Sequence, residues 1–163
     1  MNEASPSGPP GPTPAHEQLL TKVGDWKVQC TYFWGGQPMT VEGSDKVEAL
    51  GGFWTLGRFY CDTGPVQIHG LGTAGFDPER SKYIGTWQDS TNPYHYYFEG
   101  VLEDDGKRLV MTGDNIDPMS GNLVRYRSVE TFHDADNRML ELYVEQTPGE
   151  EIQILEYEYQ RKS

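Results

Sequence analysis

The side chains best suited to chemistry in this sequence are aromatic and polar residues of the kind that line binding sites. We predict seven ligand-binding residues: Trp26, Trp87, Asp89, Tyr96, Arg127, Glu141 and Tyr143. Aromatic walls with a few convergent polar groups are typical of a site for a small, partly apolar molecule. A buried arginine needs a carboxylate or a ligand anion beside it, because an unpaired buried charge is costly. The alternative is that these residues form a packed core with an arginine–acid network and bind nothing.

The stretch at residues 82–90, KYIGTWQDS, shows how such side chains can share one wall. Successive side chains of a strand point to opposite faces. One face therefore carries Tyr83, Gly85, Trp87 and Asp89. A plain core face would carry Val, Ile and Leu instead. We predict that this face lines the inside of a barrel, with Trp87 pointing inward, Asp89 nearer the rim and Tyr96 beside them on the next strand.

Motifs for metal binding or catalysis do not occur, so the sequence predicts no catalytic residue and no metal ligand. The four histidines are His16, His69, His95 and His133. No two of them have the HxH, HxxxH or HExxH spacing of a zinc site on one element. Ligands from different strands could still meet in a barrel. No GxSxG elbow is present for a serine nucleophile.

The two cysteines, Cys30 and Cys61, lie far apart and form no CxxC pair. Neither has an adjacent base or helix N-terminus to lower its pKa, so both are predicted to be buried free thiols. The chain shows neither a secreted-type cysteine framework nor a signal peptide. The simplest inference is a cytoplasmic protein.

The elements that position these residues begin after a tail. Residues 1–13 are rich in Pro, Gly and Ser and predict a disordered segment. Residues 14–163 then form one domain. Thr13 can cap a short helix that starts at Pro14 and ends at Gly24. We expect about two helical turns there and no further helix.

The rest of the chain alternates between apolar and polar residues with the period of strands. Strands are predicted near 26–32, 39–49, 53–61, 66–76, 82–89, 94–103, 107–116, 122–133, 138–146 and 151–161. Short connectors rich in Asp, Asn, Gly and Pro are typical of hairpins. About ten sequential antiparallel strands favour an up-and-down barrel, because closure removes exposed edges. An open β-sandwich is the rival arrangement.

The acidic composition limits the partners. The chain has 163 residues, and its 25 acids against 13 bases give a net charge of -12. Such a surface repels phosphate backbones and anionic lipid head groups, so neither nucleic acid nor a membrane is expected as a partner. No run approaches the roughly 20 apolar residues of a membrane span.

Several motifs resemble the mostly bacterial family called domain of unknown function 1579. They are His16-Glu17 with Leu19, Val23-Gly24-Asp25-Trp26, Leu50-Gly51-Gly52, Gly75-Phe76-Asp77, residues 82–90, Asp117-Pro118 with Gly121, and Tyr159-Gln160-Arg161-Lys162. The stretch from Gly75 to Ser90 is the most specific, although Phe76 stands where the family commonly has Tyr. The resemblance covers residues 16–162 and implies a calycin-like barrel, related to lipocalins and nitrobindins. It implies no particular reaction or ligand.

Three functions are compatible with such a barrel. The first, which we prefer, is binding of a small apolar or amphipathic molecule, without a cofactor. The second is an isomerase-like or cyclase-like enzyme; an inward carboxylate with a raised pKa, next to a tyrosine and open to a pocket, would favour it. The third is a protein-interaction or structural module.

Two further possibilities stay open at this point. Haem binding, as in the nitrobindins, would need one inward histidine, and His69, His95 and His133 are the candidates. Apolar residues on both faces of the strand near 138–146 would allow a homodimer.

Overall fold

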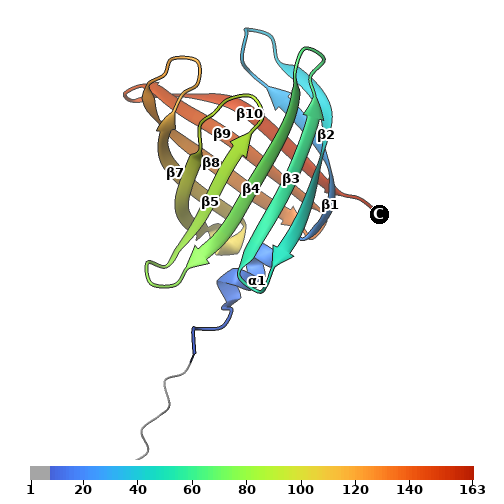
Figure 1. Cartoon of the computed structure of the whole chain (residues 1–163), viewed down its shortest axis with the longest axis vertical. Coiled ribbons are helices and arrows are strands. Elements are labelled where there is room, and N and C mark those ends of the chain that lie inside the picture. Colours follow the sequence, from blue (N-terminus) through green and yellow to red (C-terminus); the bar gives the residue numbers. More distant parts are fainter. Residues whose placement is uncertain (1–7) are drawn as a thin grey trace, which may run out of the picture.

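The computed structural model describes residues 8–163, which form one short helix followed by ten strands (Figure 1). Helix α1 spans Pro14–Leu20. The strands are β1 Gly24–Tyr32, β2 Met39–Leu50, β3 Trp54–Asp62, β4 Gln67–Asp77, β5 Lys82–Asp89, β6 Tyr96–Glu103, β7 Arg108–Ile116, β8 Leu123–Asp134, β9 Asn137–Thr147 and β10 Glu150–Arg161. A 3-10 turn, η1 Asp104–Gly106, connects β6 to β7. The predicted all-β fold with one short helix is confirmed.

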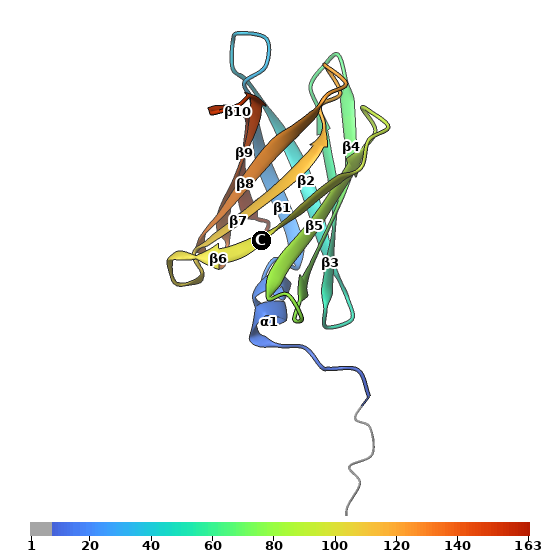
Figure 2. The same ribbon diagram turned by 90° about the vertical axis from the view of Figure 1, so that its left-hand side faces the viewer.

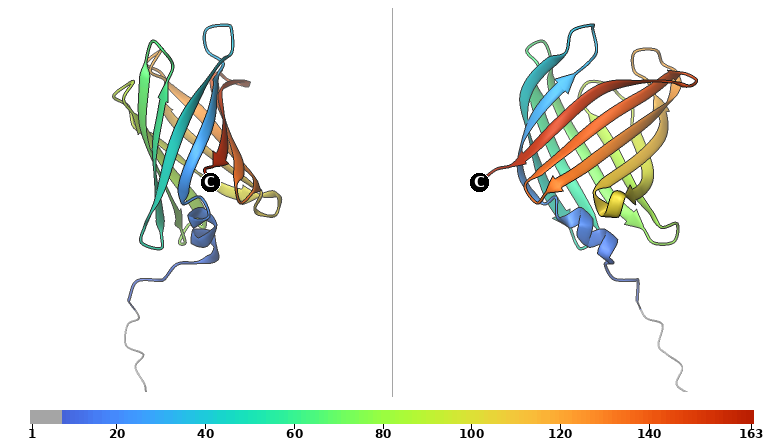
Figure 3. Two further views of the ribbon diagram at one scale, coloured as in Figure 1. Left: turned by 90° about the vertical axis from the view of Figure 1, so that its right-hand side faces the viewer. Right: turned by 180° about the vertical axis from the view of Figure 1, so that it is seen from behind.

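The ten strands close into a barrel in which each strand pairs with its neighbours in the sequence (Figure 3). The last strand returns to the first in antiparallel register, with Trp26 of β1 opposite Arg161 of β10. Closure pairs the strand edges that an open sandwich would expose. The predicted antiparallel up-and-down barrel is therefore confirmed, in agreement with a calycin-like fold.

Helix α1 starts where its capping residues predict. Thr13 has an extended backbone at the N-cap, and Pro14 takes the first helical position, where a missing N–H costs nothing. The Nδ1 atom of His16 accepts a hydrogen bond from the backbone N–H of Thr13 at 3.0 Å. The helix ends at Leu20, earlier than the predicted end at Gly24.

The same helix closes one end of the barrel (Figures 1 and 2). With its Nδ1 accepting, the His16 ring donates from Nε2 to the carbonyl oxygen of Phe76 in β4, at 3.2 Å. Leu19 packs with Tyr83 and Leu109 in an apolar cluster at this end. His16 thus anchors the helix, and Leu19 seals the barrel beneath it.

The hairpin connections lie at the two ends of the barrel. The connections at residues 33–38, 63–66, 90–95, 117–122 and 148–149 gather at the end opposite α1 (Figure 1). We call this end the mouth and the α1 end the floor. The space between the inward strand faces is called the lumen.

Part of one prediction falls outside the described chain. The predicted disordered tail spans residues 1–13, and residues 1–7 lie outside the described residues. Residues 8–12 form neither helix nor strand. Within residues 8–163, no helix is both long and apolar enough to cross a membrane.

Candidate functional site

The strand register places the KYIGTWQDS face inside the barrel. Trp87 of β5 is paired with Tyr96 of β6 and with Gly72 of β4, and paired residues share a face. Trp87 packs against buried residues of two interior clusters. Asp89 is the last residue of β5, at the mouth. The predicted orientations of Trp87, Asp89 and Tyr96 are therefore confirmed.

Two glycines of β4 make room for the Trp87 ring. A methyl group at Gly72 would lie 3.3 Å from the indole, and one at Gly70 would collide with it. The indole therefore lies against the bare backbone of β4. Its Nε1 donates a hydrogen bond to Oδ2 of Asp89 at 2.8 Å, and Oδ1 of Asp89 accepts from the backbone N–H of Thr91 at 2.8 Å. These contacts fix the ring along the wall and explain why Trp87 and Asp89 share one face of β5.

The inward side chains form two aromatic walls. One wall comes mainly from β1, β3 and β10, and its buried aromatic residues are Trp26, Tyr32, Phe59, Tyr157 and Tyr159. The other comes from β6, β8 and β9, and its buried residues are Tyr96, Phe98, Tyr126 and Val144. Trp87 packs against both walls. Trp87 therefore connects the two clusters along the side of the barrel that β5 forms.

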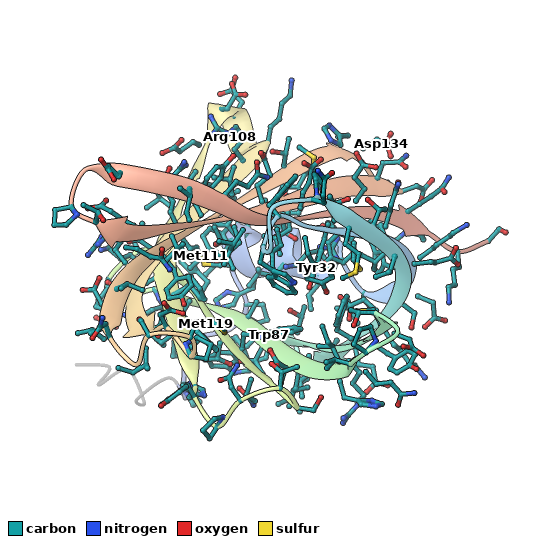
Figure 4. The ribbon with its side chains drawn as sticks, turned by 90° about the horizontal axis from the view of Figure 1, so that it is seen from above. Tyr32, Trp87, Arg108, Met111, Met119 and Asp134 are labelled. Carbon is teal, nitrogen blue, oxygen red and sulfur yellow. The ribbon has the colours of Figure 1, made fainter. Side chains whose placement is uncertain are left out.

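Apolar side chains in the middle of the barrel keep partial exposure although they face inward. Leu140 packs against the first wall, and Met111 and Leu142 pack against the second. All three are only half-buried. Figure 4 looks down the barrel and shows Tyr32, Trp87 and Met111 inside the ring of strands. The interior is thus not completely filled by its own side chains.

One tryptophan lies in a connection at the mouth. Trp34, in the connection from β1 to β2, continues the inward series of β1 beyond its last residue, Tyr32. Its ring stacks on Tyr32 with 4.3 Å between centroids, and it is 52% exposed. The next two residues, Gly35 and Gly36, have φ of 82° and 89°, a region that favours glycine.

Below this mouth, tyrosine and cysteine side chains interact in the first wall. The hydroxyl groups of Tyr32 and Tyr157 lie 2.8 Å apart, and the Tyr32 hydroxyl lies 3.3 Å from Sγ of Cys61. Cys30 and Cys61 are both free and buried, as predicted. Burial raises the pKa of Cys30 and of Tyr32. Burial therefore favours the neutral, hydrogen-bonding forms of Cys30 and Tyr32.

The floor of the lumen contains four charged side chains. Glu130 of β8 receives hydrogen bonds from Arg138 Nη1 at 2.6 Å and from Lys22 Nζ at 3.2 Å. Nη2 of Arg138 lies 3.8 Å from Oδ2 of Asp45 in β2. Two cations thus face two carboxylates, and we call Lys22, Asp45, Glu130 and Arg138 the floor network.

Aromatic rings surround the Arg138 guanidinium. Its Cζ lies 3.7 Å from the ring centre of Tyr159 and 4.7 Å from that of Trp26. Trp26 also contacts the Arg161 guanidinium at 4.3 Å, and its Nε1 donates to the backbone oxygen of Lys22 at 2.8 Å. Trp26 therefore faces inward, but at 1% exposure it belongs to the floor.

The pKa values of the two carboxylates of the floor network are shifted in opposite directions. Burial raises the pKa of Asp45, and the opposing effect of Arg138 and Lys22 does not cancel the increase. For Glu130, burial also acts to raise the pKa, but Lys22 and Arg138 outweigh it and the pKa is lowered. The difference follows from contact, because Glu130 is hydrogen-bonded to both cations and Asp45 to neither.

The sequence matches the family described as protein of unknown function (DUF1579) over residues 11–161. The chain belongs to this family. A comparison with curated proteins found no match. Membership of DUF1579 agrees with the observed barrel, and it leaves the role of the lumen to be argued from the side chains.

Three predicted site residues of this DUF1579 barrel do not reach the lumen. Arg127 is paired with Tyr143, and its neighbours in β8, Tyr126 and Ser128, are the inward ones. Arg127 binds Glu151 through two hydrogen bonds of 2.9 and 2.6 Å, and its guanidinium lies over the Tyr143 ring at 4.5 Å. The prediction of Arg127 and Tyr143 as lumen residues is wrong. Alternation with a period of two shows which residues share a face, but it does not show which face is inside.

Glu141 belongs to the same outer cluster of the DUF1579 barrel. It accepts a hydrogen bond from the Tyr143 hydroxyl at 2.7 Å. Burial and the neighbouring Glu141 raise the pKa of Tyr143 to about 12. Glu141 is therefore an outer-face residue, and its prediction as a lumen residue is also wrong.

No candidate histidine of this DUF1579 member lines the lumen. His69 lies on the outer face, where its ring contacts Tyr60 at 4.9 Å between centroids. His95 and His133 are exposed, and His16 is used by the helix cap. Within residues 8–163, no group of three or more His, Cys, Asp or Glu side chains is placed to hold a metal ion.

Sequence reasoning missed the charged residues of the DUF1579 floor. Asp45 and Val47 share the face that continues from Trp26 through the register of β1 and β2, so alternation alone could have suggested an inward acid. Glu130 and Arg138 carried no such signal, because both faces of their strands mix apolar and charged residues.

Proposed function

We propose that the barrel binds a small, partly apolar molecule in its lumen. The ligand would lie between the two aromatic walls, below the mouth and above the floor network. The observation that carries this proposal is the partial exposure of Met111, Leu140 and Leu142, which face inward in the middle of the barrel. In a filled core, such side chains would be buried on every side.

The dimensions and chemistry of the interior support the proposal. Barrels of eight strands are just wide enough for side chains to fill, so ten strands leave more room. The lumen offers aromatic rings for an apolar body and few polar groups for orientation, a composition common in ligand pockets. Trp87 contacts both walls, so a ligand between them would touch its indole.

Native mass spectrometry of the freshly purified full chain tests this first. A retained ligand would appear as a mass above that of the chain, and the same spectra would report whether the chain forms a homodimer. A titration with the neutral fluorescent probe Nile red then tests the lumen without knowledge of the ligand. We expect saturable binding of about one probe per lumen, a stoichiometry that follows from a single enclosed site.

A variant that fills the lumen locates the probe. Leu142→Trp adds a ring from β9 into the interior, at an expected cost of about 1–3 kcal/mol for overpacking. The matched control is Val101→Trp, on the exposed outer face of β6. Leu142→Trp should abolish Nile red binding and keep a cooperative melting transition, whereas the control should bind as the wild type does. Equal binding by both variants would contradict lumen binding.

One observation bears on the alternative of a lumen enzyme. Asp45 is an inward carboxylate whose pKa is raised by burial, and its charge acts to raise the pKa of Tyr159. The Asp45 side chain is only 11% exposed, which limits direct contact with a substrate. Binding is therefore the better-supported function, and a chemically altered ligand after incubation would favour the enzyme.

A further inference from the structure

We propose that the outer face of β3–β6 binds the same face of a second copy of this chain, so that two barrels form a symmetric dimer. This inference does not depend on lumen binding. It assigns an interaction surface to side chains that the proposed function does not use.

The surface is a set of apolar side chains on the outside of the barrel. Five of them form what we call the outer patch: Trp54 and Leu56 of β3, Leu71 of β4, Ile84 of β5 and Tyr97 of β6. Trp54 and Tyr97 are each 39% exposed, and the other three are half-buried. Figure 1 shows β3, β4 and β5 side by side on the near side of the barrel. Contiguous exposed apolar side chains mark interaction surfaces, whereas isolated ones need no explanation.

The polar side chains at the centre of the outer patch already have a partner. Thr73 and Thr86 are paired on β4 and β5, and their hydroxyl groups hydrogen-bond to each other. Leu56 lies beside Thr73, and Tyr97 lies beside Thr86. Covering this row therefore costs less than covering free hydroxyl groups would.

Trp54 is held in position by the strand next to it. A Cβ atom at Gly75 would collide with the Trp54 ring, so the indole lies against the bare backbone of β4. Trp87 lies on Gly70 in the same way inside the barrel. Tryptophan is among the residues that contribute most to interface energies, and a ring that is already fixed loses little conformational entropy on binding.

The charges that border the outer patch balance one another. Glu99 pairs with Arg80 at 2.7 Å and with Lys82 at 3.5 Å. The register places Glu99 beside Ile84 and Arg58 beside Leu71. Charges of both signs therefore surround the patch, although the whole chain has a net charge of -12.

The opposite side of the barrel is strongly acidic. Strands β9 and β10 lie across the barrel from β4 and β5 (Figure 3). Their outer faces carry five glutamates: Glu141, Glu145, Glu151, Glu156 and Glu158. A dimer through these strands would bring like charges together, so two copies meet with less repulsion at the outer patch.

The face is large enough for a weak, specific dimer. Four neighbouring strands, each with about eight residues in the sheet, cover roughly 19 by 26 Å, or about 500 Å². Two copies would bury about 1,000 Å² in total, the lower size limit of a specific interface. We therefore expect a dissociation constant in the micromolar range.

Size-exclusion chromatography with light scattering tests the dimer on the full chain. Between about 1 and 100 μM, which brackets a micromolar dissociation constant, the mass should rise from 18.4 kDa toward twice that value. Added salt should strengthen association, because it screens the repulsion between two acidic chains and leaves apolar contact intact. A monomer mass at every concentration, or a dimer that dissociates in salt, would overturn the proposal.

A lysine in the outer patch locates the contact. Leu71→Lys should weaken the dimer at least about tenfold, because its ammonium group would be covered without a partner. Ile152→Lys is the matched control, since it makes the same charge change at a side chain of β10 that is 51% exposed. It should dimerise as the wild type does. Leu56→Lys repeats the test on β3, in case Leu71→Lys does not fold.

The variants also separate this inference from lumen binding. If folded Leu71→Lys or Leu56→Lys dimerises as well as Ile152→Lys does, or if all of them dissociate, the outer patch is not the interface. Leu71→Lys should bind Nile red as the wild type does, because its side chain points away from the lumen. Loss of the dimer with Nile red binding intact is therefore the expected result.

Discussion

Replacing Glu130 with Gln removes the carboxylate that joins Lys22 to Arg138 at the floor of the barrel. The substitution keeps the volume of the side chain and removes its charge. In the wild type, Glu130 contacts the two buried cations at 3.2 and 2.6 Å. After the substitution, only the more distant Asp45 remains to balance their charge. Stability should fall, because breaking a buried ion pair exposes the surviving charges to an apolar environment without compensation.

The expected loss is about 3–5 kcal/mol, the range for removing one partner of a buried pair. Gln still accepts a hydrogen bond, which favours the lower end. With a urea slope of about 2 kcal/mol per molar for a domain of this size, the unfolding midpoint should fall by roughly 1.5 M. Urea unfolding followed by tryptophan fluorescence measures this shift.

The control for this experiment is Glu141→Gln on the outer face. Glu141 accepts a hydrogen bond from Tyr143, but no cation of the floor network depends on it. Its substitution should change the free energy of unfolding by less than about 1 kcal/mol. If Glu130→Gln shifts the midpoint no more than Glu141→Gln does, the argument for the floor network is wrong.

The pH dependence of the same variant provides a second check. The folded pKa of Glu130 is lowered from the reference value of 4.5. Its contribution to stability is therefore present above that reference pKa and is lost as the pH falls through the lowered folded pKa. The difference between wild type and Glu130→Gln should shrink in this acidic window, and a difference that is constant with pH would contradict the assignment.

Three further predictions concern other residues. Trp87→Ala should destabilise the barrel by about 3–5 kcal/mol in urea unfolding, because a large ring leaves a cavity between two walls; a change below about 1 kcal/mol would argue against its bridging role. The raised pKa of Asp45 means that its ionisation costs stability, so melting temperatures should show a loss as the pH rises through this pKa; Asp45→Asn should remove that component. Arg127→Ala should cost less than about 1 kcal/mol by the same denaturation assay, because its pair with Glu151 is partly solvated, and a larger loss would point to a role beyond the surface.

The strands and their order could be predicted from the sequence because they depend on local chemistry. Alternation over 82–90 defined one face of β5, and the turn residues between strands indicated hairpins. Trp87 could also be oriented correctly, because the opposite face of β5 carries Lys82 and Gln88, which suit water better than a tryptophan does.

The faces of β8 and β9 could not be oriented in this way. In β8, Tyr126 and Ser128 point inward while Arg127 and Val129 point outward. Each face therefore combines one residue that suits the core with one that suits water, and composition does not show which face is inside. Period-two alternation fixes which residues share a face, and only contact with the rest of the barrel decides which face is inside.

By itself, then, the sequence determined a short helix, ten antiparallel strands and the wall that holds Trp87. Tertiary structure alone decided the complete floor network, because Asp45 lies far along the chain from Glu130 and Arg138 and meets them only when β1 pairs with β10. The pKa differences between these acids also arise at that stage, since burial and charge contacts exist only after the barrel has closed.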